Sequence, residues 1–70
     1  MDALSVFAAN LRRLRHERSL TQEDLASRAT MDASELRRFE SGRRDPGIRV
    51  LLRLSRGLEV RPADLLEGIE

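Results

Sequence analysis

Two short helix patterns, separated by only three residues, dominate the middle of the sequence. Thr21 precedes the first pattern as an N-cap, with Asp24 three residues on in the spacing of a capping box. Asp32 precedes the second pattern in the same way, with Glu35 three residues on. A break this short allows only an angled corner between two helices. The stretch therefore predicts a helix-turn-helix over about residues 21–40.

Apolar residues in this stretch recur at helical spacing, which gives each predicted helix one inward face. The residues expected to set the corner are Leu25, Ala26, Ala29, Met31, Leu36 and Phe39. Polar side chains occupy the remaining positions of the second helix. The sequence thus predicts a helix with a buried face and a densely polar outer face.

Further helical patterns flank the motif, and no strand pattern occurs. The predicted helices cover residues 3–18, about 22–29, about 33–40, about 48–57 and a short last helix that starts near Pro62. Asp2 is the expected N-cap of the first helix, and proline suits the first position of the last. Seventy residues are near the lower size at which one core suffices. We expect a single all-α domain over residues 1–70.

Three- and four-residue spacing also predicts which faces of the outer helices are buried. In the first helix, the face opposite the apolar stripe contains Asn10, Arg12, Arg13 and Glu17. In the fourth helix, the predicted core face consists of Ile48, Leu51, Leu52 and Leu54. Another face of that helix carries Arg49, Arg53 and Arg56, which lie three and four residues apart.

Charge is unevenly distributed although the net charge is only +1. All thirteen basic residues are arginine, and all lie between Arg12 and Arg61. That span holds eight acidic residues and so carries +5, while four acidic residues nearer the ends restore +1. The asymmetry favours a basic binding surface, although solvated helix faces would explain any single arginine.

Several classes of function find no support in the composition. The chain has no cysteine, and His16 is its single histidine, expected on the surface. We therefore expect no metal site, no cofactor and no enzymatic activity, since no nucleophile and base can be paired. No apolar run approaches the roughly 20 residues of a membrane span, and no signal-peptide pattern opens the chain. These features favour a cytoplasmic protein. We also expect no small-molecule ligand, since a single small domain leaves no second domain to house a pocket.

The motifs together resemble one known family. The matching residues are Gln22–Ala26, Leu36, Phe39, Glu40, Gly42, Arg43, Pro46, Leu51, Leu54, Leu58, Val60, Leu65 and Leu66. Over about residues 7–68 this pattern is similar to the phage-repressor/Cro type of helix-turn-helix regulators (the XRE family). The resemblance implies a five-helix, lambda-repressor-like domain that binds double-stranded operator DNA as a symmetric homodimer.

This chain departs from the family pattern at several helix ends. Ser19 and Thr30 stand where the family usually has glycine, and Glu59 stands within a usual Leu-Gly-Val. Arg61 replaces the usual serine cap of the last helix, which weakens that N-terminus. We expect strain at Thr30 in particular, because glycine alone adopts left-handed backbone without cost.

The outer face of the second motif helix is the expected DNA-reading surface. The expected DNA contacts are Thr21, Gln22, Ala33, Ser34, Glu35, Arg37, Arg38, Arg43 and Arg44. The resemblance assigns base reading to Ala33, Ser34 and Arg38, and phosphate contact to Gln22. Arg38 is the strongest reader, because arginine bonds guanine in bidentate fashion. The alternative for Arg38 is a surface ion pair with Glu35.

Two further roles follow from the resemblance. Arg15, one residue past the apolar stripe, is expected to form a partly buried salt bridge with Glu40. The dimer contacts are expected at Val60, Leu65 and Ile69. The alternative for these three is that they close the core of the monomer.

The predicted function is sequence-specific transcriptional regulation on a palindromic operator. The alternative is a protein-interaction module of the antitoxin or adaptor kind, built on the same scaffold. Glu35 on the reading helix and the low net charge favour that alternative slightly. The chain can also be one domain of a longer regulator.

Overall fold

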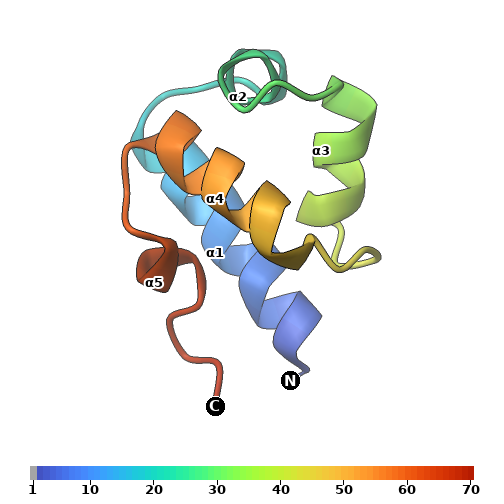
Figure 1. Cartoon of the computed structure of the whole chain (residues 1–70), viewed down its shortest axis with the longest axis vertical. Coiled ribbons are helices and arrows are strands. Elements are labelled where there is room, and N and C mark those ends of the chain that lie inside the picture. The colour runs from blue at the N-terminus through green and yellow to red at the C-terminus, as the bar shows by residue number, and fades with distance from the viewer. Residues whose placement is uncertain (1) are drawn as a thin grey trace.

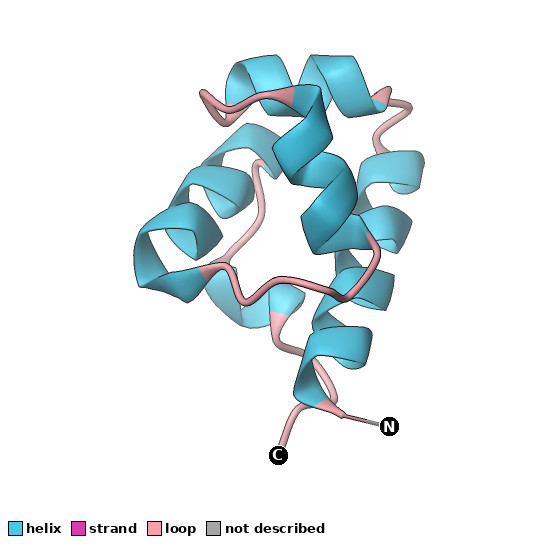
Figure 2. Ribbon diagram, turned by 90° about the vertical axis from the view of Figure 1, so that its right-hand side faces the viewer, coloured by secondary structure: helices cyan, strands magenta, loops and turns pink. Residues whose placement is uncertain are grey.

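The computed structural model describes residues 2–70 and contains five helices with no strand among those residues. The helices are α1 Ala3–Glu17, α2 Gln22–Arg28, α3 Ala33–Glu40, α4 Gly47–Leu58 and α5 Pro62–Leu65. In Figure 1, α4 lies across the front of α1, α3 stands beside them, and α2 is seen end-on. Figure 2 shows the same bundle from the side, with the two chain ends close together in both views. The predicted all-α class and helix order are confirmed, with each boundary within one residue where the prediction gave one.

Local capping explains where α1 and α2 begin. The Asp2 carboxylate accepts a hydrogen bond from the Ser5 N–H at 2.9 Å, as predicted. Thr21 Oγ1 accepts from the Asp24 N–H, and Asp24 Oδ2 accepts from the Thr21 N–H, both at 3.0 Å. This reciprocal pair is the predicted capping box, with aspartate in place of glutamate.

The predicted cap of α3 is only half right. Asp32 occupies the N-cap position with extended backbone, but its side chain makes no capping hydrogen bond. At α5, Pro62 takes the first helical position, and Asp64 Oδ2 accepts from the Arg61 N–H at 3.0 Å. An arginine side chain has no acceptor, so α5 receives one half of a capping box.

Three helix ends use left-handed backbone at residues other than glycine. Ser19 has a φ of 54°, Thr30 of 58° and Glu59 of 58°. Each such residue costs roughly 1–2 kcal/mol, because its Cβ crowds the following carbonyl oxygen. The strain predicted at Thr30 is confirmed, and Ser19 and Glu59 share it. Helix α4 ends at Leu58, and Glu59 is its left-handed C-cap residue.

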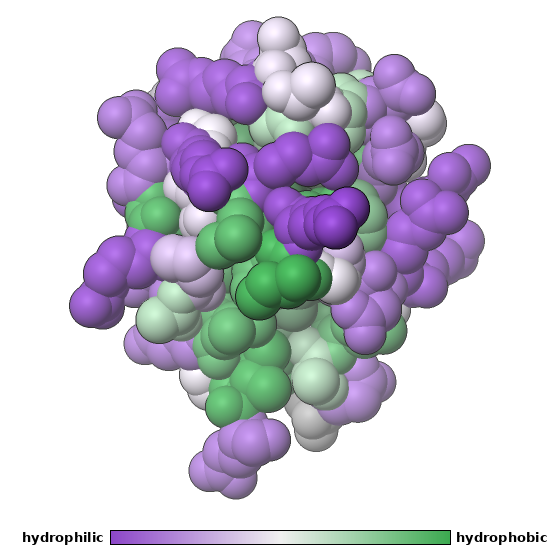
Figure 3. Space-filling view, viewed as in Figure 1, coloured by the Kyte–Doolittle hydropathy of each residue, from purple (hydrophilic) through white to green (hydrophobic). Residues whose placement is uncertain are grey.

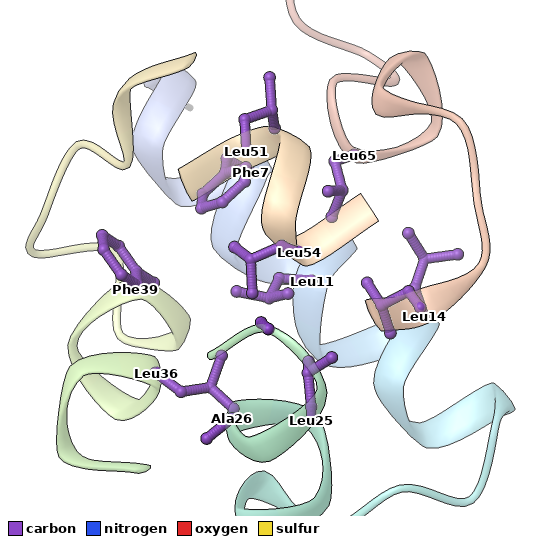
Figure 4. Close-up of a cluster of buried hydrophobic side chains, with 12 residues drawn as sticks. Phe7, Leu11, Leu14, Leu25, Ala26, Leu36, Phe39, Leu51, Leu54 and Leu65 are labelled. Atoms are coloured by element: carbon purple, nitrogen blue, oxygen red, sulfur yellow. The ribbon is translucent and has the colours of Figure 1, made fainter. Parts of the chain in front are cut away.

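The core lies where all five helices meet, and Figure 4 shows the side chains of the buried cluster converging there. The buried cluster contains Phe7, Leu11, Leu14, Leu25, Ala26, Ala29, Leu36, Phe39, Leu51, Leu54, Leu58 and Leu65. Gly57 lies inside α4 against α2, where an added Cβ would come within 3.2 Å of Leu25 Cδ1. The absence of a side chain there lets α2 and α4 approach closely. The core therefore holds the helix-turn-helix against α1 and α4.

The structure contradicts the predicted exposure of two residues, Asn10 and Ile48. Asn10 was expected in solvent, but it is 9% exposed, and its Nδ2 donates to the carbonyls of Leu65 and Glu67, both at 2.9 Å. The C-terminal segment folds back over α1 at this point, which periodicity within α1 does not reveal. Ile48 was expected in the core but is 68% exposed. It lies in the first turn of α4, which overhangs an open groove and not a closed core.

The three predicted dimer contacts differ in burial. Leu65 is completely buried inside this one chain, so its assignment to a dimer surface is wrong. Val60 and Ile69 are half-buried and pack against the core from outside. The alternative, that these residues close the core of the monomer, holds for Leu65. No helix within residues 2–70 has the length and apolar content to cross a membrane.

Candidate nucleic-acid interface

The helix α3 presents opposite chemistry on its two faces. Leu36 and Phe39 point into the core with exposed fractions of 0% and 3%. Ser34, Arg37 and Arg38 are exposed on the other side. The core contacts hold α3 in place, so the outer face is displayed from a fixed backbone.

Arg37 and Arg38 form no ion pair within residues 2–70. The alternative pairing of Arg38 with Glu35 is absent there. Glu35 approaches Arg44 at 4.0 Å instead, across the loop that follows α3. Both α3 guanidinium groups are therefore unpaired on the surface.

Two residues in the first turn of α3 are less exposed. Ala33 is half-buried and packs against the edge of the core, and Glu35 is also half-buried. Ala33 therefore has a packing role in addition to any contact it makes outside the chain. Ser34, between them, is the most accessible polar residue of this first turn.

A buried ion pair anchors the far end of α3. Arg15 Nε lies 2.6 Å from Glu40 Oε2, and Arg15 Nη2 lies 3.0 Å from Glu40 Oε1. The side chains are only 10% and 4% exposed, so the predicted salt bridge is confirmed and is bidentate. Arg15 Nη1 also donates to the Leu20 carbonyl at 2.9 Å. The pair thus ties α1 to both ends of the helix-turn-helix.

Gln22 belongs to this same network. Its Nε2 donates to Glu40 Oε1 at 3.0 Å, which links the start of α2 to the end of α3. An amide NH₂ group has two hydrogens, so the second remains for an external acceptor. The Thr21 hydroxyl oxygen accepts a hydrogen bond from the Asp24 N–H in the capping box.

Arg12 is the residue of this network that sequence reasoning missed. It was placed on the solvent face of α1, and it is exposed, but its Nη1 donates to the Glu40 carbonyl. This bond gives one of the last carbonyls of α3 a charged donor. The available signal was its position three residues before Arg15, on the same side of the helix.

A basic loop continues the surface beyond α3. Gly42 turns the chain with a φ of 75°, and Arg43 and Arg44 follow it on the exposed side. The Arg43 N–H donates to the Arg38 carbonyl at 3.4 Å, which holds the loop against the helix end. The structure thus brings four arginines of α3 and its loop into one region.

The comparisons with known proteins agree with this geometry. A family model described as a helix-turn-helix domain matches residues 6–67. The chain belongs to the helix-turn-helix family. This membership confirms the resemblance to phage-repressor/Cro-type regulators and the predicted class of DNA-binding regulatory domain.

Relatives match this helix-turn-helix chain over most of its length. The uncharacterized HTH-type transcriptional regulator y4dJ of Sinorhizobium fredii is 35% identical over 66 residues, which cover 94% of this chain and 86% of y4dJ. The restriction-modification controller protein C.AhdI of Aeromonas hydrophila is 34% identical with a TM-score of 0.86, over 89% of this chain and 94% of C.AhdI. A hypothetical transcription factor, NHTF from Neisseria, is 26% identical with a TM-score of 0.88, over 93% and 75%.

Proposed function

We propose that this protein is a sequence-specific transcriptional regulator that places α3 in the major groove of a palindromic operator. The observation that carries the proposal is the outer face of α3, where Arg37 and Arg38 are exposed and unpaired on a helix held in place by the core. A groove-reading helix needs long donors on a rigid backbone, and this face provides them. Such a protein would act in the cytoplasm, on the chromosome.

Arg38 is the proposed base reader. Its guanidinium can bond guanine O6 and N7 together, a contact worth about 1–3 kcal/mol of discrimination. Ser34 can bond several bases, and Ala33 can contact only a thymine methyl group. Specificity would therefore come chiefly from a guanine opposite Arg38.

Phosphate contacts would hold the helix in register. Arg43 and Arg44 follow α3 on the exposed side, and Arg37 is exposed on α3 itself, so all three are available to the DNA backbone. The second amide hydrogen of Gln22 is the corresponding donor at the start of α2. Glu35 lies 4.0 Å from Arg44. It would accept a hydrogen bond from the amino group of cytosine, or repel phosphate at unsuitable sites.

Two copies of the chain are needed for useful specificity. One reading helix covers only a few base pairs, so family members of this type place two helices about one helical turn (roughly 34–36 Å) apart. A homodimer on a two-fold operator meets this requirement. The same symmetry predicts a palindromic site.

Random-site selection followed by sequencing tests the proposal. We expect an enriched palindrome with a guanine at one position of each half, and we expect Arg38→Ala to lose that preference. The Arg18→Ala variant, changed at the end of α1, is the matched control and should select the same palindrome. Failure to enrich any palindrome would favour the adaptor or antitoxin alternative.

A salt titration on duplex DNA separates the two functions independently. Several neutralised phosphates predict that the logarithm of affinity falls steeply and linearly with the logarithm of salt concentration. An adaptor that uses another face would show no duplex binding at any salt concentration. The Glu35–Arg44 contact weakens the argument for an adaptor, because the acid on the reading helix is partly neutralised.

A further inference from the structure

A row of three arginines follows one side of α4. Arg49, Arg53 and Arg56 are four and three residues apart, so they lie on one face of the helix over two turns, about 10 Å. Together with Leu52 they line an open hollow of about 410 Å³. Figure 3 shows strongly hydrophilic side chains over the upper centre of the face that carries α4, beside a hydrophobic area. We term these four residues the α4 hollow.

The chain supplies no counter-charge to this row. No ion pair within residues 2–70 involves any of the three arginines. The last acid before the row, Asp45, accepts a hydrogen bond from the Gly47 N–H at 3.0 Å. The first acid after it, Glu59, approaches Arg28 at 3.7 Å. Three like charges held together in this way favour a negatively charged partner from outside.

Arg53, at the centre of the row, has an unsatisfied donor. Its Nη1 reaches the Thr30 carbonyl at 3.4 Å, while its Nε is buried without a hydrogen-bond partner. Such buried donors are rare in folded proteins, because nearly all of them are paired. A carboxylate bound in the hollow would give the guanidinium two parallel hydrogen bonds, one of them from Nε. The free chain therefore leaves a hydrogen bond unmade at the centre of the hollow.

Leu52 gives the hollow an apolar contact as well. Helical spacing placed this residue on the core face of α4, but it is only half-buried and lies outside the buried cluster. Its side chain leaves apolar area in water among three positive charges. A protein segment can cover that area with apolar side chains, whereas the phosphates of DNA offer only charged oxygen atoms. The mixture of charge and apolar area thus favours a protein partner.

We propose that the α4 hollow docks an acidic helix of another protein. A facing antiparallel helix with glutamates at positions i, i+3 and i+7 repeats the spacing of the row, so each glutamate meets one arginine. Within residues 2–70, no helix of this chain has more than two acidic residues, so the complementary helix belongs to a different protein. The site uses α4 and not the outer face of α3, so docking goes beyond operator binding and does not require it.

The size and exposure of the hollow define the kind of complex. One helix laid along two turns of α4 buries less than the roughly 1,200 Å² at which stable interfaces begin, so the complex should be transient. Arg49 and Arg56 are exposed, so salt should screen their ion pairs and weaken binding.

A synthetic helical peptide tests the proposal. The probe is an alanine-rich, fluorescently labelled peptide of about 18 residues, since shorter isolated helices are marginal in water. It carries glutamate at positions i, i+3 and i+7 and leucine at i+4. We expect the full chain to bind this glutamate peptide at low salt, measured by fluorescence anisotropy.

Two control peptides define the specificity. One has glutamine at the three glutamate positions, and the other has the same three glutamates dispersed around the helix. Both should bind about tenfold more weakly than the glutamate peptide, since each exposed ion pair contributes little and the three must act together.

Charge reversal in the protein sharpens this test. Arg49→Glu/Arg56→Glu changes two exposed residues, so the thermal melt should stay close to that of the wild type. This variant should bind the glutamate peptide about tenfold more weakly or worse. It should instead bind a peptide with arginine at i and i+7. Arg18→Glu/Arg61→Glu makes the same charge change at exposed positions outside the hollow and should bind the glutamate peptide about as well as the wild type.

Leu52→Ser separates a protein partner from DNA. The loss of apolar contact should weaken binding of the glutamate peptide several-fold while leaving duplex DNA affinity unchanged. Both measurements are made at a temperature at which circular dichroism shows the variant to be folded.

The outcomes that overturn the proposal are distinct from failure of the proposed function. A wild-type chain that binds the dispersed peptide as well as the glutamate peptide would show only general charge attraction. An Arg49→Glu/Arg56→Glu variant that keeps the glutamate peptide would place the docking site elsewhere. Loss of duplex affinity in this variant, with no peptide binding by the wild type, would make the row a phosphate contact. A chain that binds the glutamate peptide but selects no operator would leave this site standing and refute operator binding instead.

Discussion

The two faces of α3 carry charge for opposite purposes, as Glu40 and Arg38 illustrate. Glu40 is 4% exposed and receives hydrogen bonds from Arg15 and Gln22. Arg38, two residues earlier, is exposed and has no ion-pair partner within residues 2–70. One charge is satisfied inside the chain, while the other is available to a partner.

This difference separates stability from recognition. A buried charge whose partner is removed remains in a low-dielectric environment without compensation, so its loss should destabilise the fold. An exposed charge is solvated in the free protein, so its loss should affect only the bound state. Variants of the two faces should therefore affect different measurements.

The largest expected effect is that of Glu40→Ala on stability. The substitution leaves Arg15 buried and unpaired, which costs about 3–5 kcal/mol. In thermal unfolding followed by circular dichroism, we expect the midpoint to fall by more than about 10 °C for a chain of this size.

The double variant Arg15→Met/Glu40→Leu is the matched control. Removing both charges leaves none stranded, so we expect much of the lost stability to return. A Glu40→Ala melt within a degree or two of the wild type would abolish the distinction between the faces.

Arg38→Ala should have a smaller effect, on binding alone. We expect affinity for the selected operator to fall by about 1–3 kcal/mol, with preference relaxed at one base pair per half-site. The melting temperature should stay close to that of the wild type, since exposed substitutions usually change stability by less than about 0.5 kcal/mol.

Arg38→Lys refines this test because it keeps the charge but loses the bidentate geometry. If Arg38 reads a base, the lysine variant should lose specificity while keeping non-specific affinity. Equal losses by Arg38→Ala on operator and random DNA would instead identify a phosphate contact.

Thr30→Gly addresses the corner between α2 and α3. A left-handed β-branched residue is strained, so glycine should stabilise the chain by about 0.5–1 kcal/mol. We expect the melting temperature to rise by a few degrees. Ser27→Gly, in the last turn of α2, should lower it, because glycine is unfavourable in right-handed helix. A fall with Thr30→Gly would mean that this corner is not strained.

The smallest expected effect is that of acid pH on the stability that the Asp24 capping box contributes. Hydrogen bonds from the Thr21 backbone N–H, and then from its side chain, hold the pKa of the Asp24 carboxyl below its ordinary value of 3.8. A depressed pKa means that the capping box stabilises the chain above pH 3.8 and loses this contribution as pH falls through the folded-state pKa. Asp24→Ala should therefore be less stable than the wild type at pH 7, and the gap should narrow in acid.

Glu23→Ala is the control for this titration. Glu23 lies in the same turn but makes no capping bond, so its variant should differ little from the wild type at either pH. An Asp24→Ala gap that stays constant down to acid pH would show that the carboxylate is not the source of the stability.

Much of the candidate interface could be predicted because it depends on local pattern. The inward spacing of Leu36 and Phe39 determines which face of α3 is left outside. The partner of Arg15 could not be found this way. The sequence showed only a charge beside an apolar stripe that needed an acid, and the family resemblance supplied Glu40.

The sequence by itself determined where the helices begin, where they end and which face of α3 is free. These features depend on residues three or four apart, such as Thr21 with Asp24, or on single left-handed positions such as Thr30. Only the tertiary structure decided the roles of Asn10, Ile48 and Leu65. Asn10 is bonded to the carbonyl of Leu65, 55 residues away, and Ile48 is exposed because the groove beneath it stays open. Such contacts join segments that are brought together by packing. The periodicity of a single helix shows which of its faces is buried, but not which distant segment packs on it.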